Sequence, residues 1–554
     1  MDLSGHLRTP SQTSFSSLSN SPKLHFLIPI LPILTVFGPG FQSISTFTFL
    51  WFILSIFYIR NTSKWWLFLI YYILNSVGFM FAYLNMFGAV GLKGYPGIMF
   101  SIGLLINLIM FLSLILDKIS QHMFNVVGWA RILTFPFVWT GLWTIFLYTW
   151  AFGDMTNYAF SLLGVDEIMQ FASFAGLGGI NFILAWGGPI GCDVLTNWLL
   201  INTQNSLNVQ NGGSLIIDQD LEDHSTDTIL STNNIRRRRH FFKFSIPSIF
   251  TSLFVYLVVL FLIISYGSIR LSTGYLPFYQ QSINDLVPSP LITMGCVIRQ
   301  NSSINSDYIE TTRELAANGS KIVLWSEGSG NITDTTQLNE LFTSLTNISQ
   351  TYNTYVGVAY LDFRPEQPHY NKLAVISPSG DIIIDYAKSN LVPFMESTVF
   401  NRGVNVLQTN ITKEFGVIGA AICFDYDFPS LIKQASKKNV NLMLDASPVG
   451  ILHARMNAVR SIENGFTMLR CNANGISGVW GPYGQPYHYV PTTITNTKYV
   501  IFQVPLYPRV KTVYGIFGET FGWICVAMSG VIIIAMIIGW KGSAKWKATI
   551  LKWF

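Results

Sequence analysis

The sequence predicts a multi-pass α-helical membrane domain of about eight spans joined to an extramembrane α/β domain. Half of the 554 residues are hydrophobic and only 11% are charged, which is not the composition of a soluble protein. The apolar residues gather into long runs, whereas residues 286–510 alternate short β-branched runs with helical patterns. These two patterns indicate membrane helices on both sides of one folded α/β domain.

The apolar runs are uncharged, and each is about long enough to cross a ~30 Å hydrocarbon core. Buried core helices are also apolar all round, but so many runs of this length favour membrane spans. Gly38-Pro39-Gly40 cannot continue a helix, so the first run is expected to form two spans. No cleavable signal peptide is evident, so the first span should remain as an anchor. The runs are 24–59, 65–92, 94–116, 132–153, 168–192, 244–269 and 521–540.

The basic residues predict the orientation. With a cytoplasmic N-terminus, the Lys- and Arg-bearing segments 60–64, 117–131 and 201–243 and both chain ends all lie in the cytoplasm, as the positive-inside rule requires. These clusters, including Arg236 to Arg239, are expected to face anionic lipid headgroups and do not indicate nucleic acid. The predicted order is a tail at 1–23, six spans within 24–200, a disordered basic loop at 201–243, a span at 244–269, the α/β domain at 286–510, a span at 519–540 and a tail at 541–554.

The α/β domain is therefore expected on the far side of the membrane, lumenal or extracellular in a eukaryote and periplasmic in a bacterium. Five N-x-S/T sequons fall in it and support this side weakly, because a chain rich in Asn, Ser and Thr contains some by chance. These sequons begin at Asn301, Asn318, Asn331, Asn347 and Asn410.

Two cysteines of this domain, Cys296 and Cys471, could form a disulfide, but nothing in their spacing favours it over two free buried thiols. We therefore expect no bridge. Cys192 and Cys525 lie in apolar runs and are expected to pack there. No His, Cys or Asp cluster has metal-ligand spacing and no glycine-rich phosphate loop follows a strand, so no metal or nucleotide cofactor is predicted.

Within the α/β domain, β-branched runs predict strands and amphipathic runs predict helices. Pro429 suits the first turn of a helix, and Ser377-Pro378-Ser379-Gly380 suits a turn between strands. Strands are expected at 292–298, 322–325, 355–360, 373–376, 382–385, 415–423 and 442–444, and helices at 308–317, 336–351, 429–438 and 453–470.

Three reactive side chains stand at strand ends in this scheme: Glu327, Lys388 and Cys423. The ends of buried strands commonly build active sites. Each residue also has an ordinary interpretation, as a solvated loop acid, a surface lysine and an inert buried thiol.

Taken together, these residues resemble the Glu-Lys-Cys triad of the nitrilase superfamily, and the surrounding motifs resemble those of the apolipoprotein N-acyltransferases. This resemblance implies an αββα sandwich for the α/β domain. Its motifs are Gly295 to Asn301, Tyr370-Asn371, Tyr386-x-Lys388, Leu391 to Glu396, His453-Ala454-Arg455, Arg460 to Glu463, Arg470 to Ser477 and, in the membrane part, Phe135 to Trp139.

The chain departs from the family's pattern at several positions. Ser326 replaces Pro, Met395 replaces Gly, and Asp425 stands where the acyltransferases usually have Glu. The family generally has Asn-Asp-x-Trp-Phe-Gly near the substrate entrance, where this chain has Asp445-Ala446-Ser447-Pro448-Val449-Gly450. These differences put the specificity for the acceptor in doubt rather than the chemistry.

The chemistry assigns a role to each residue of the triad. Cys423 attacks only as thiolate, so Glu327 is the candidate base, and Lys388 with the backbone N–H of Phe424 could stabilise an oxyanion. Glu396 would orient Lys388 and the acceptor, although a structural salt bridge is an alternative. Asp425 is expected to support the site, and Tyr386 to pack beside it.

The resemblance implies a phospholipid donor, a thioester on Cys423 and an amine acceptor that receives the acyl chain. Membrane lipids are the other expected partners. A membrane-tethered amidase of the nitrilase type would use the same triad with water in place of the amine. A transporter or receptor with an inactive enzyme-like domain is the third reading. The small number of ionisable residues within the membrane runs argues against an ion pathway.

Overall fold

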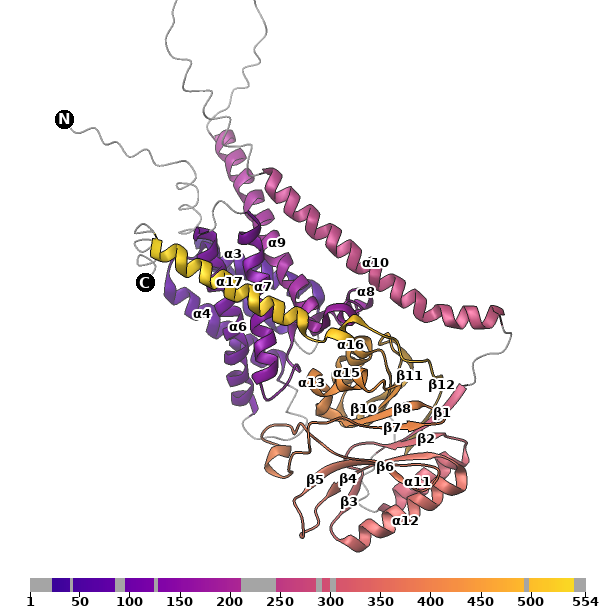
Figure 1. The fold of residues 1–554 in the computed structure, drawn as a ribbon. Coiled ribbons are helices and arrows are strands. Elements are labelled where there is room, and N and C mark those ends of the chain that lie inside the picture. Colours follow the sequence, from indigo (N-terminus) through magenta and orange to yellow (C-terminus); the bar gives the residue numbers. More distant parts are fainter. Residues whose placement is uncertain are drawn as a thin grey trace, which may run out of the picture. The chain divides into compact units, whose positions relative to one another are not determined.

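The computed structural model describes residues 22–39, 43–84, 95–123, 128–210, 246–284, 291–298, 305–492 and 498–542 (Figure 1). The chain forms two compact units. A helical unit comprises Met1–Leu142, Asn181–Leu262 and Cys525–Phe554, and a second unit comprises Trp143–Ile180 and Ile263–Ile524. The second unit therefore contains the α/β domain together with the segment from the end of the fifth predicted span into the sixth, the C-terminal part of α10 (Ile246–Asn284) and the start of α17 (Thr520–Gly542).

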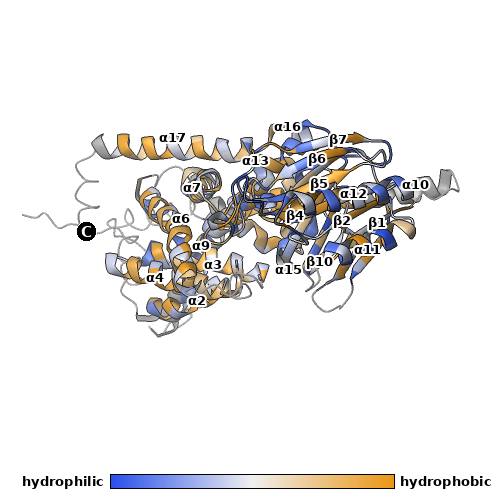
Figure 2. Cartoon of the chain, turned by 90° about the horizontal axis from the view of Figure 1, so that it is seen from below, coloured by the Kyte–Doolittle hydropathy of each residue, from blue (hydrophilic) through white to orange (hydrophobic). Residues whose placement is uncertain are grey.

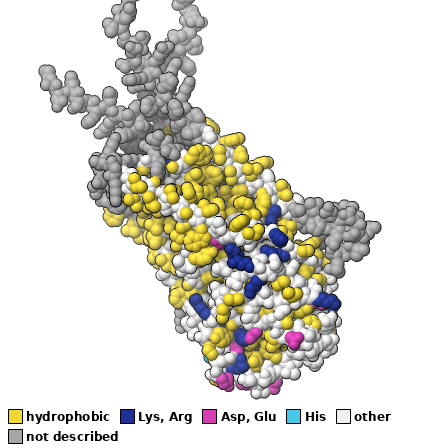
Figure 3. Space-filling view, in the orientation of Figure 1, with side chains coloured by type: hydrophobic (Ala, Val, Ile, Leu, Met, Phe, Trp, Pro, Cys, Tyr) yellow, Lys and Arg dark blue, Asp and Glu magenta, His cyan; other side chains and the backbone are white. Residues whose placement is uncertain are grey.

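In the part of the chain that the structure describes, a helix lies in each of the eight predicted spans. Six of these helices are long and apolar enough to cross a membrane by length and composition: α4 (Trp65–Ala82), α6 (Tyr95–Met123), α7 (Gly128–Thr149), α9 (Ala172–Gln210), α10 (Ile246–Asn284) and α17 (Thr520–Gly542). The first apolar run divides, as expected, into α2 (Leu27–Phe37) and α3 (Ser45–Asn61), which are shorter at 11 and 17 residues. Figure 2 shows the apolar character of these helices, and Figure 3 shows hydrophobic side chains gathered over the helical unit.

Several of the basic residues expected to face lipid headgroups are instead paired inside the helical unit. The Arg60 guanidinium lies 2.8 Å from Asp117 and 2.8 Å from Asp193, and Arg131 lies 2.7 Å from Asp193. Lys118 donates to the backbone carbonyls of Ile59 and Thr62. The pairs connect residues of α3, α6, α7 and α9. Because an unpaired charge among apolar helices is costly, loss of one partner would destabilise the packing of these helices.

One boundary of the predicted cytoplasmic loop is wrong. Helix α9 continues to Gln210, so residues 201–210 are helical rather than part of a disordered loop. Residues 211–245, with the basic run Arg236 to Arg239, lie outside the described residues, as do the tail before Pro22 and most of the tail after α17.

Two sheets form the centre of the α/β domain. Sheet A has the strand order β12-β1-β2-β4-β5-β6, with β3 paired to β4, and sheet B has the order β11-β10-β9-β8-β7. The strands are β1 (Leu291–Val297), β2 (Ile322–Trp325), β3 (Gly330–Ile332), β4 (Tyr355–Asp362), β5 (Tyr370–Ile376), β6 (Ile382–Ala387), β7 (Gln408–Thr412), β8 (Gly416–Ile422), β9 (Leu442–Gly450), β10 (Thr467–Trp480), β11 (Pro486–Pro491) and β12 (Tyr499–Pro505).

The inward faces of the two sheets share one apolar core, which includes Val323, Val375, Ile422 and Leu444. Helices α11 (Asn305–Ala317) and α12 (Thr335–Tyr352) cover sheet A. The short helices α13 (Pro429–Ile432) and α14 (Gln434–Lys437), together with α15 (Ile451–Asn464), cover sheet B over a second core. The domain is therefore the αββα sandwich that the resemblance implied (Figure 1).

All seven predicted strands are present, but the predicted helix at 453–470 is too long. Gly465 adopts the left-handed conformation (φ 73°) and ends α15 at Asn464, so β10 begins at Thr467. A left-handed residue after the last helical turn favours glycine because it has no Cβ. The short or polar strands β3, β7 and β11 were not predicted either, and the apolar strand β12 was also missed.

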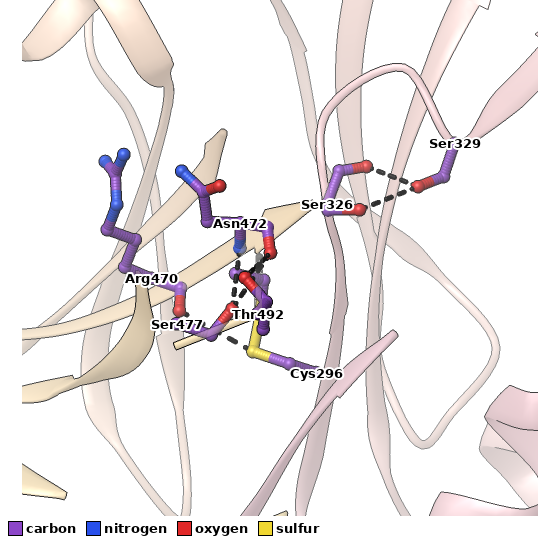
Figure 4. Close-up of a disulfide and its surroundings, with 8 residues drawn as sticks. Cys296, Ser326, Ser329, Arg470, Asn472, Ser477 and Thr492 are labelled. Carbon is purple, nitrogen blue, oxygen red and sulfur yellow. Dashed lines mark hydrogen bonds between the residues drawn. A yellow bond between two sulfur atoms is a disulfide. The ribbon is translucent and has the colours of Figure 1, made fainter. Parts of the chain in front are cut away.

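The expectation that Cys296 and Cys471 are free thiols is wrong. They form a disulfide that joins β1 of sheet A to β10 of sheet B across the shared core, with 5.4 Å between their Cα atoms (Figure 4). The two residues are 175 positions apart. Their spacing in the sequence could not reveal the bond, because only the stacking of the two sheets brings the strands together.

Candidate active site

The three reactive side chains at strand ends come together inside the sandwich. Glu327 follows β2, Lys388 follows β6 and Cys423 follows β8, with exposed fractions of 3%, 1% and 8%. The Lys388 ammonium lies 2.7 Å from Glu327 Oε1, and both charges act on the Cys423 thiol. The site therefore draws on both sheets.

Cys423 stands at a sharp turn. Strand β8 ends at Ile422, and Cys423 opens the single 3-10 turn η4 (Cys423–Asp427) with φ 45°, a left-handed conformation that strains a residue with a Cβ. Asp425 holds this turn, because its Oδ2 accepts from the backbone N–H of Ile422 (3.1 Å) and from the Tyr386 hydroxyl (2.8 Å). Tyr386 thus connects β6 to the turn, and Asp425 supports the turn rather than facing solvent.

A second carboxylate completes the surroundings of Lys388. Glu396 Oε1 lies 2.8 Å from the Lys388 ammonium, and Glu396 Oε2 accepts from the backbone N–H of Val392 at 2.9 Å. The Asn371 side chain donates to Glu327 Oε1 (2.6 Å) and more weakly to Glu396 Oε1 (3.3 Å). The sequence marked Asn371 only as part of a motif, and it was not among the predicted site residues.

Burial and charge set the protonation of these groups. Burial raises the pKa of Glu327 to about 7, although Lys388 opposes this shift. Burial lowers the pKa of Lys388, but Glu327 and Glu396 outweigh that effect and hold it well above its ordinary value. Burial also raises the pKa of Glu396, but Lys388 outweighs it and the net shift is downward. The site therefore holds a fixed cation, a fixed carboxylate at Glu396 and a proton-exchanging carboxyl at Glu327.

The free oxygen of Glu327 is important for what the site can do. Glu327 Oε2 is buried and accepts no hydrogen bond from the residues that the structure describes. Burial raises the pKa of the Cys423 thiol, and the Glu327 charge adds to this, so the thiol carries its proton at rest. A thiol, a carboxylate with an open oxygen and a fixed ammonium can together add sulfur to a carbonyl carbon.

The segment after α7 packs against the nucleophile turn within the second unit. The Phe152 ring meets the edge of Phe424 at 6.4 Å between centroids, and the backbone N–H of Asp154 donates to the Asp427 carbonyl at 2.9 Å. Phe424 is buried, and its predicted role through its backbone N–H stays a prediction. No sequence signal pointed to residues 150–157 as part of this site.

The same segment carries a buried ionic cluster. Asp154 lies 2.7 Å from the Arg460 guanidinium, which lies 2.8 Å from Glu463, and Glu519 is a further buried carboxylate nearby. Burial raises the pKa of Asp154 and of Glu463 to about 8 each, with Arg460 opposing. Arg460 acts on all three carboxyl groups and Lys433 also acts on Glu519, while burial favours the protonated form of each carboxyl.

Among the described residues, no group of three or more His, Cys, Asp or Glu side chains is arranged to hold a metal ion.

Comparison with known proteins agrees with the resemblance of the motifs. Residues 307–499 match the carbon-nitrogen hydrolase family. The chain is 26% identical over 189 residues to an apolipoprotein N-acyltransferase of Geobacter metallireducens, a match that covers 30% of this chain and 35% of that protein. It is 23% identical over 259 residues to an apolipoprotein N-acyltransferase of Borreliella burgdorferi, covering 40% and 49%. The matches thus span half or less of these two relatives.

A hydrolase of Schizosaccharomyces pombe is 25% identical over 243 residues, covering 37% of this chain and 75% of that protein. Among solved structures, an amidase from Nesterenkonia sp. matches with a TM-score of 0.36 and 14% identity, covering 41% of this chain and 93% of the amidase.

Proposed function

We propose that this chain, an apolipoprotein N-acyltransferase-like member of the nitrilase superfamily, moves a fatty acyl chain from a phospholipid through a thioester on Cys423 to an amine acceptor. The observation that carries the proposal is the burial of the Cys423 thiol beside the Glu327–Lys388 pair, in a chain with six long apolar helices. A phospholipid stays in the bilayer, so an enzyme that uses it must work at the membrane surface.

In the first half-reaction, Glu327 Oε2 takes the proton of the Cys423 thiol, and the sulfur attacks the carbonyl carbon of a phospholipid acyl ester. Lys388 and the backbone N–H of Phe424 stabilise the oxyanion that forms. The ester C–O bond then breaks, and Glu327 gives its proton to the departing oxygen. The products are lysophospholipid and an acyl thioester on Cys423.

In the second half-reaction, the acceptor amine attacks the thioester carbonyl and transfers its proton to Glu327. The C–S bond breaks, the amide leaves, and the proton returns from Glu327 to the Cys423 sulfur. The same carboxyl group is used twice, so the kinetics should be ping-pong. A pKa near 7 suits this double use, since a general acid-base group is most effective near the working pH.

The neighbouring residues would act by positioning. Glu396 and Asn371 hold the Lys388 ammonium and Glu327 Oε1 in place through the contacts above. Asp425 and Tyr386 fix the turn that presents the sulfur. Glu396 also retains an exposed edge, with 18% of its side chain accessible, which suits contact with the acceptor amine.

We propose that the chain is an integral membrane protein. Its termini would be cytoplasmic, and its α/β domain would lie on the lumenal, extracellular or periplasmic side. The disulfide supports this side, because disulfides persist in oxidising compartments. Asn318, Asn331 and Asn347 are exposed in their sequons and could carry glycans there, whereas the Asn410 side chain donates to the Ile383 carbonyl of β6 at 3.1 Å. Asn301 lies outside the described residues.

Hydrolysis of a C–N bond is the second candidate, because residues 307–499 match the carbon-nitrogen hydrolase family. An amidase of this kind would form an acyl-enzyme on Cys423 from an amide and resolve it with water. The two functions therefore differ in the acyl donor and in the acceptor.

A labelled phospholipid tests the proposal. Full-length protein in vesicles that contain a phospholipid with an isotope-labelled acyl chain should form a labelled thioester on the Cys423 peptide, detected by mass spectrometry. Cys423→Ala should lose the label, and Cys525→Ser, a change at another buried free thiol, should keep it. An unlabelled Cys423 peptide together with turnover of a small amide would contradict acyl transfer and favour the hydrolase.

A further inference from the structure

A buried ion pair that the proposed mechanism does not use lies close to Cys423. Asp445 on β9 and Arg470 on β10 are partners in the strand register, and both are fully buried. Their side chains form an ion pair. Asp445 Oδ1 also accepts from the Ser447 hydroxyl (2.7 Å) and Oδ2 from the Asn457 amide (3.0 Å), so the carboxylate is held at both oxygens.

The pair lies on the face of sheet B that α15 covers. Ala421 of β8 is the register partner of Asp445 and belongs to the core beneath α13 to α15, not to the core between the sheets. Figure 4 shows the Arg470 side chain directed away from the disulfide and hence from the core between the sheets. Residues of α15 complete the surroundings of the pair.

The ion pair is linked to the nucleophile turn through a histidine. The Arg470 guanidinium lies 3.4 Å from His453 Nδ1, and His453 Nε2 lies 3.0 Å from Asp427 Oδ2. Because a guanidinium only donates, Nδ1 must accept, and Nε2 then carries the proton donated to Asp427. Asp427 is the last residue of the turn that begins at Cys423. Through Asp427, the network therefore holds the C-terminal end of the turn. It also lies beside β8, the strand that leads into the turn.

The two charges act on the Cys423 sulfur in opposite directions. Burial is the largest effect that raises the pKa of this thiol, and the Glu327 charge raises it further. Lys388 and Arg470 lower it, and Asp445 raises it again.

We infer that Asp445 and Arg470 are positioning residues for Cys423, which hold its turn through His453 and Asp427 and set the positive charge that reaches the sulfur. The inference rests on the proposed use of Cys423 as the nucleophile. It concerns the reactivity of the thiol itself, before any substrate binds.

The rate of alkylation of Cys423 tests this inference without any turnover. Iodoacetamide is added to full-length protein in detergent across a pH series, and the Cys423 peptide is followed by mass spectrometry, since only the thiolate reacts. Asp445→Asn preserves shape and removes the negative charge, so the apparent thiol pKa should fall by roughly half a unit or more. Arg470→Met removes the positive charge, so the apparent pKa should rise by a similar amount.

The opposite signs separate a charge effect from damage to the fold, which would move both variants in the same direction. The double variant should return towards the wild-type value, because both charges are gone. Asp362→Asn is the matched control: it removes another buried carboxylate of the domain, which pairs with the partly exposed Arg364 at 2.8 Å, and it should leave the alkylation profile unchanged. Shifts of the same sign, or no shift in either single variant, would overturn the inference. If the thiol pKa shifts in opposite directions in the two variants but no lipid-derived thioester forms, the inference stands and only the proposed acyl transfer is contradicted.

Discussion

Replacing Glu327 with Gln removes the proposed base while keeping its shape. In the folded protein Glu327 Oε1 accepts from Lys388 at 2.7 Å and from Asn371 at 2.6 Å, and the Gln carbonyl oxygen can accept both bonds. Lys388 keeps its second carboxylate, Glu396, at 2.8 Å. The group that changes is Oε2, which has no partner among the described residues and is the oxygen available to the thiol proton.

The expected loss follows from that single change. General acid-base catalysis by a positioned side chain contributes about 10²- to 10⁴-fold, so Glu327→Gln should slow acylation of Cys423 by about 10³-fold, equivalent to about 4 kcal/mol of barrier. The thiol should become easier to ionise at the same time, because the Glu327 charge raises its pKa. A lower thiol pKa by itself would increase the thiolate population and speed up acylation. Slower acylation together with a lower thiol pKa would therefore indicate loss of the base.

The pH dependence gives a second measure. Acylation needs Glu327 as carboxylate, and burial raises the pKa of this group to about 7, so the wild-type rate should rise with pH and level off above about pH 7. Glu327→Gln should lose this inflection. Single-turnover acylation by labelled phospholipid, measured between pH 5 and pH 9, provides both the rate and the profile. A variant that acylates within tenfold of wild type, or keeps the inflection, would refute the assignment of Glu327.

Four further results are expected. Glu396→Gln removes one of the two carboxylates around Lys388 and should slow aminolysis of the thioester by about tenfold or more, measured with a preformed acyl-enzyme; equal slowing of acylation would contradict an acceptor role. Cys296→Ser breaks the bond between the sheets and should lower the free energy of unfolding by about 2–5 kcal/mol, measured by denaturant titration of the detergent-solubilised protein; an unchanged value would mean that the bond is absent. The raised pKa values of Asp154 and Glu463, about 8 in the folded protein, mean that the folded state binds more protons than the unfolded chain between about pH 4 and pH 8. Thermal stability should therefore fall as pH rises through this window and level off above it, and Asp154→Asn should flatten the slope; a rising melting temperature would contradict the buried cluster. Protein made in a eukaryotic host should shift on a gel after glycosidase treatment, and Asn347→Gln should remove one increment; the absence of any shift would contradict glycosylation of the α/β domain.

The three candidate residues could be placed near strand ends because β-branched and apolar runs predict the strands before them, but their selection as a triad rested on the resemblance of the surrounding motifs to the nitrilase superfamily. Asn371 could not be predicted, because its importance depends on the pairing of β5 with β6 and on its reach to two carboxylates. Strand β10 was not predicted because the helical pattern of residues 453–470 continues past Gly465. The left-handed conformation of Gly465, which ends α15, depends on the surrounding fold as well as on the local sequence.

Contacts between distant segments were also out of reach of the sequence. The Cys296–Cys471 bond joins strands of different sheets, and the contact of Phe152 with Phe424 joins residues 272 positions apart in a chain with no pattern to suggest it. The membrane runs were predicted because hydrophobicity alone marks them, whereas the pairing of Arg60 with two aspartates depends on how the helices pack.

The dependence of Arg460 on Asp154 limits how this protein can be divided or recombined. A fragment cut at 286–510 would look like a complete sandwich, but it would leave behind Asp154, the carboxylate 2.7 Å from the Arg460 guanidinium, and Phe152, which covers Phe424. Exchange of the α/β domain with that of another multi-pass relative should therefore fail unless residues 143–180 are exchanged with it. Those two parts of the chain have to change together in evolution, although more than a hundred residues separate them.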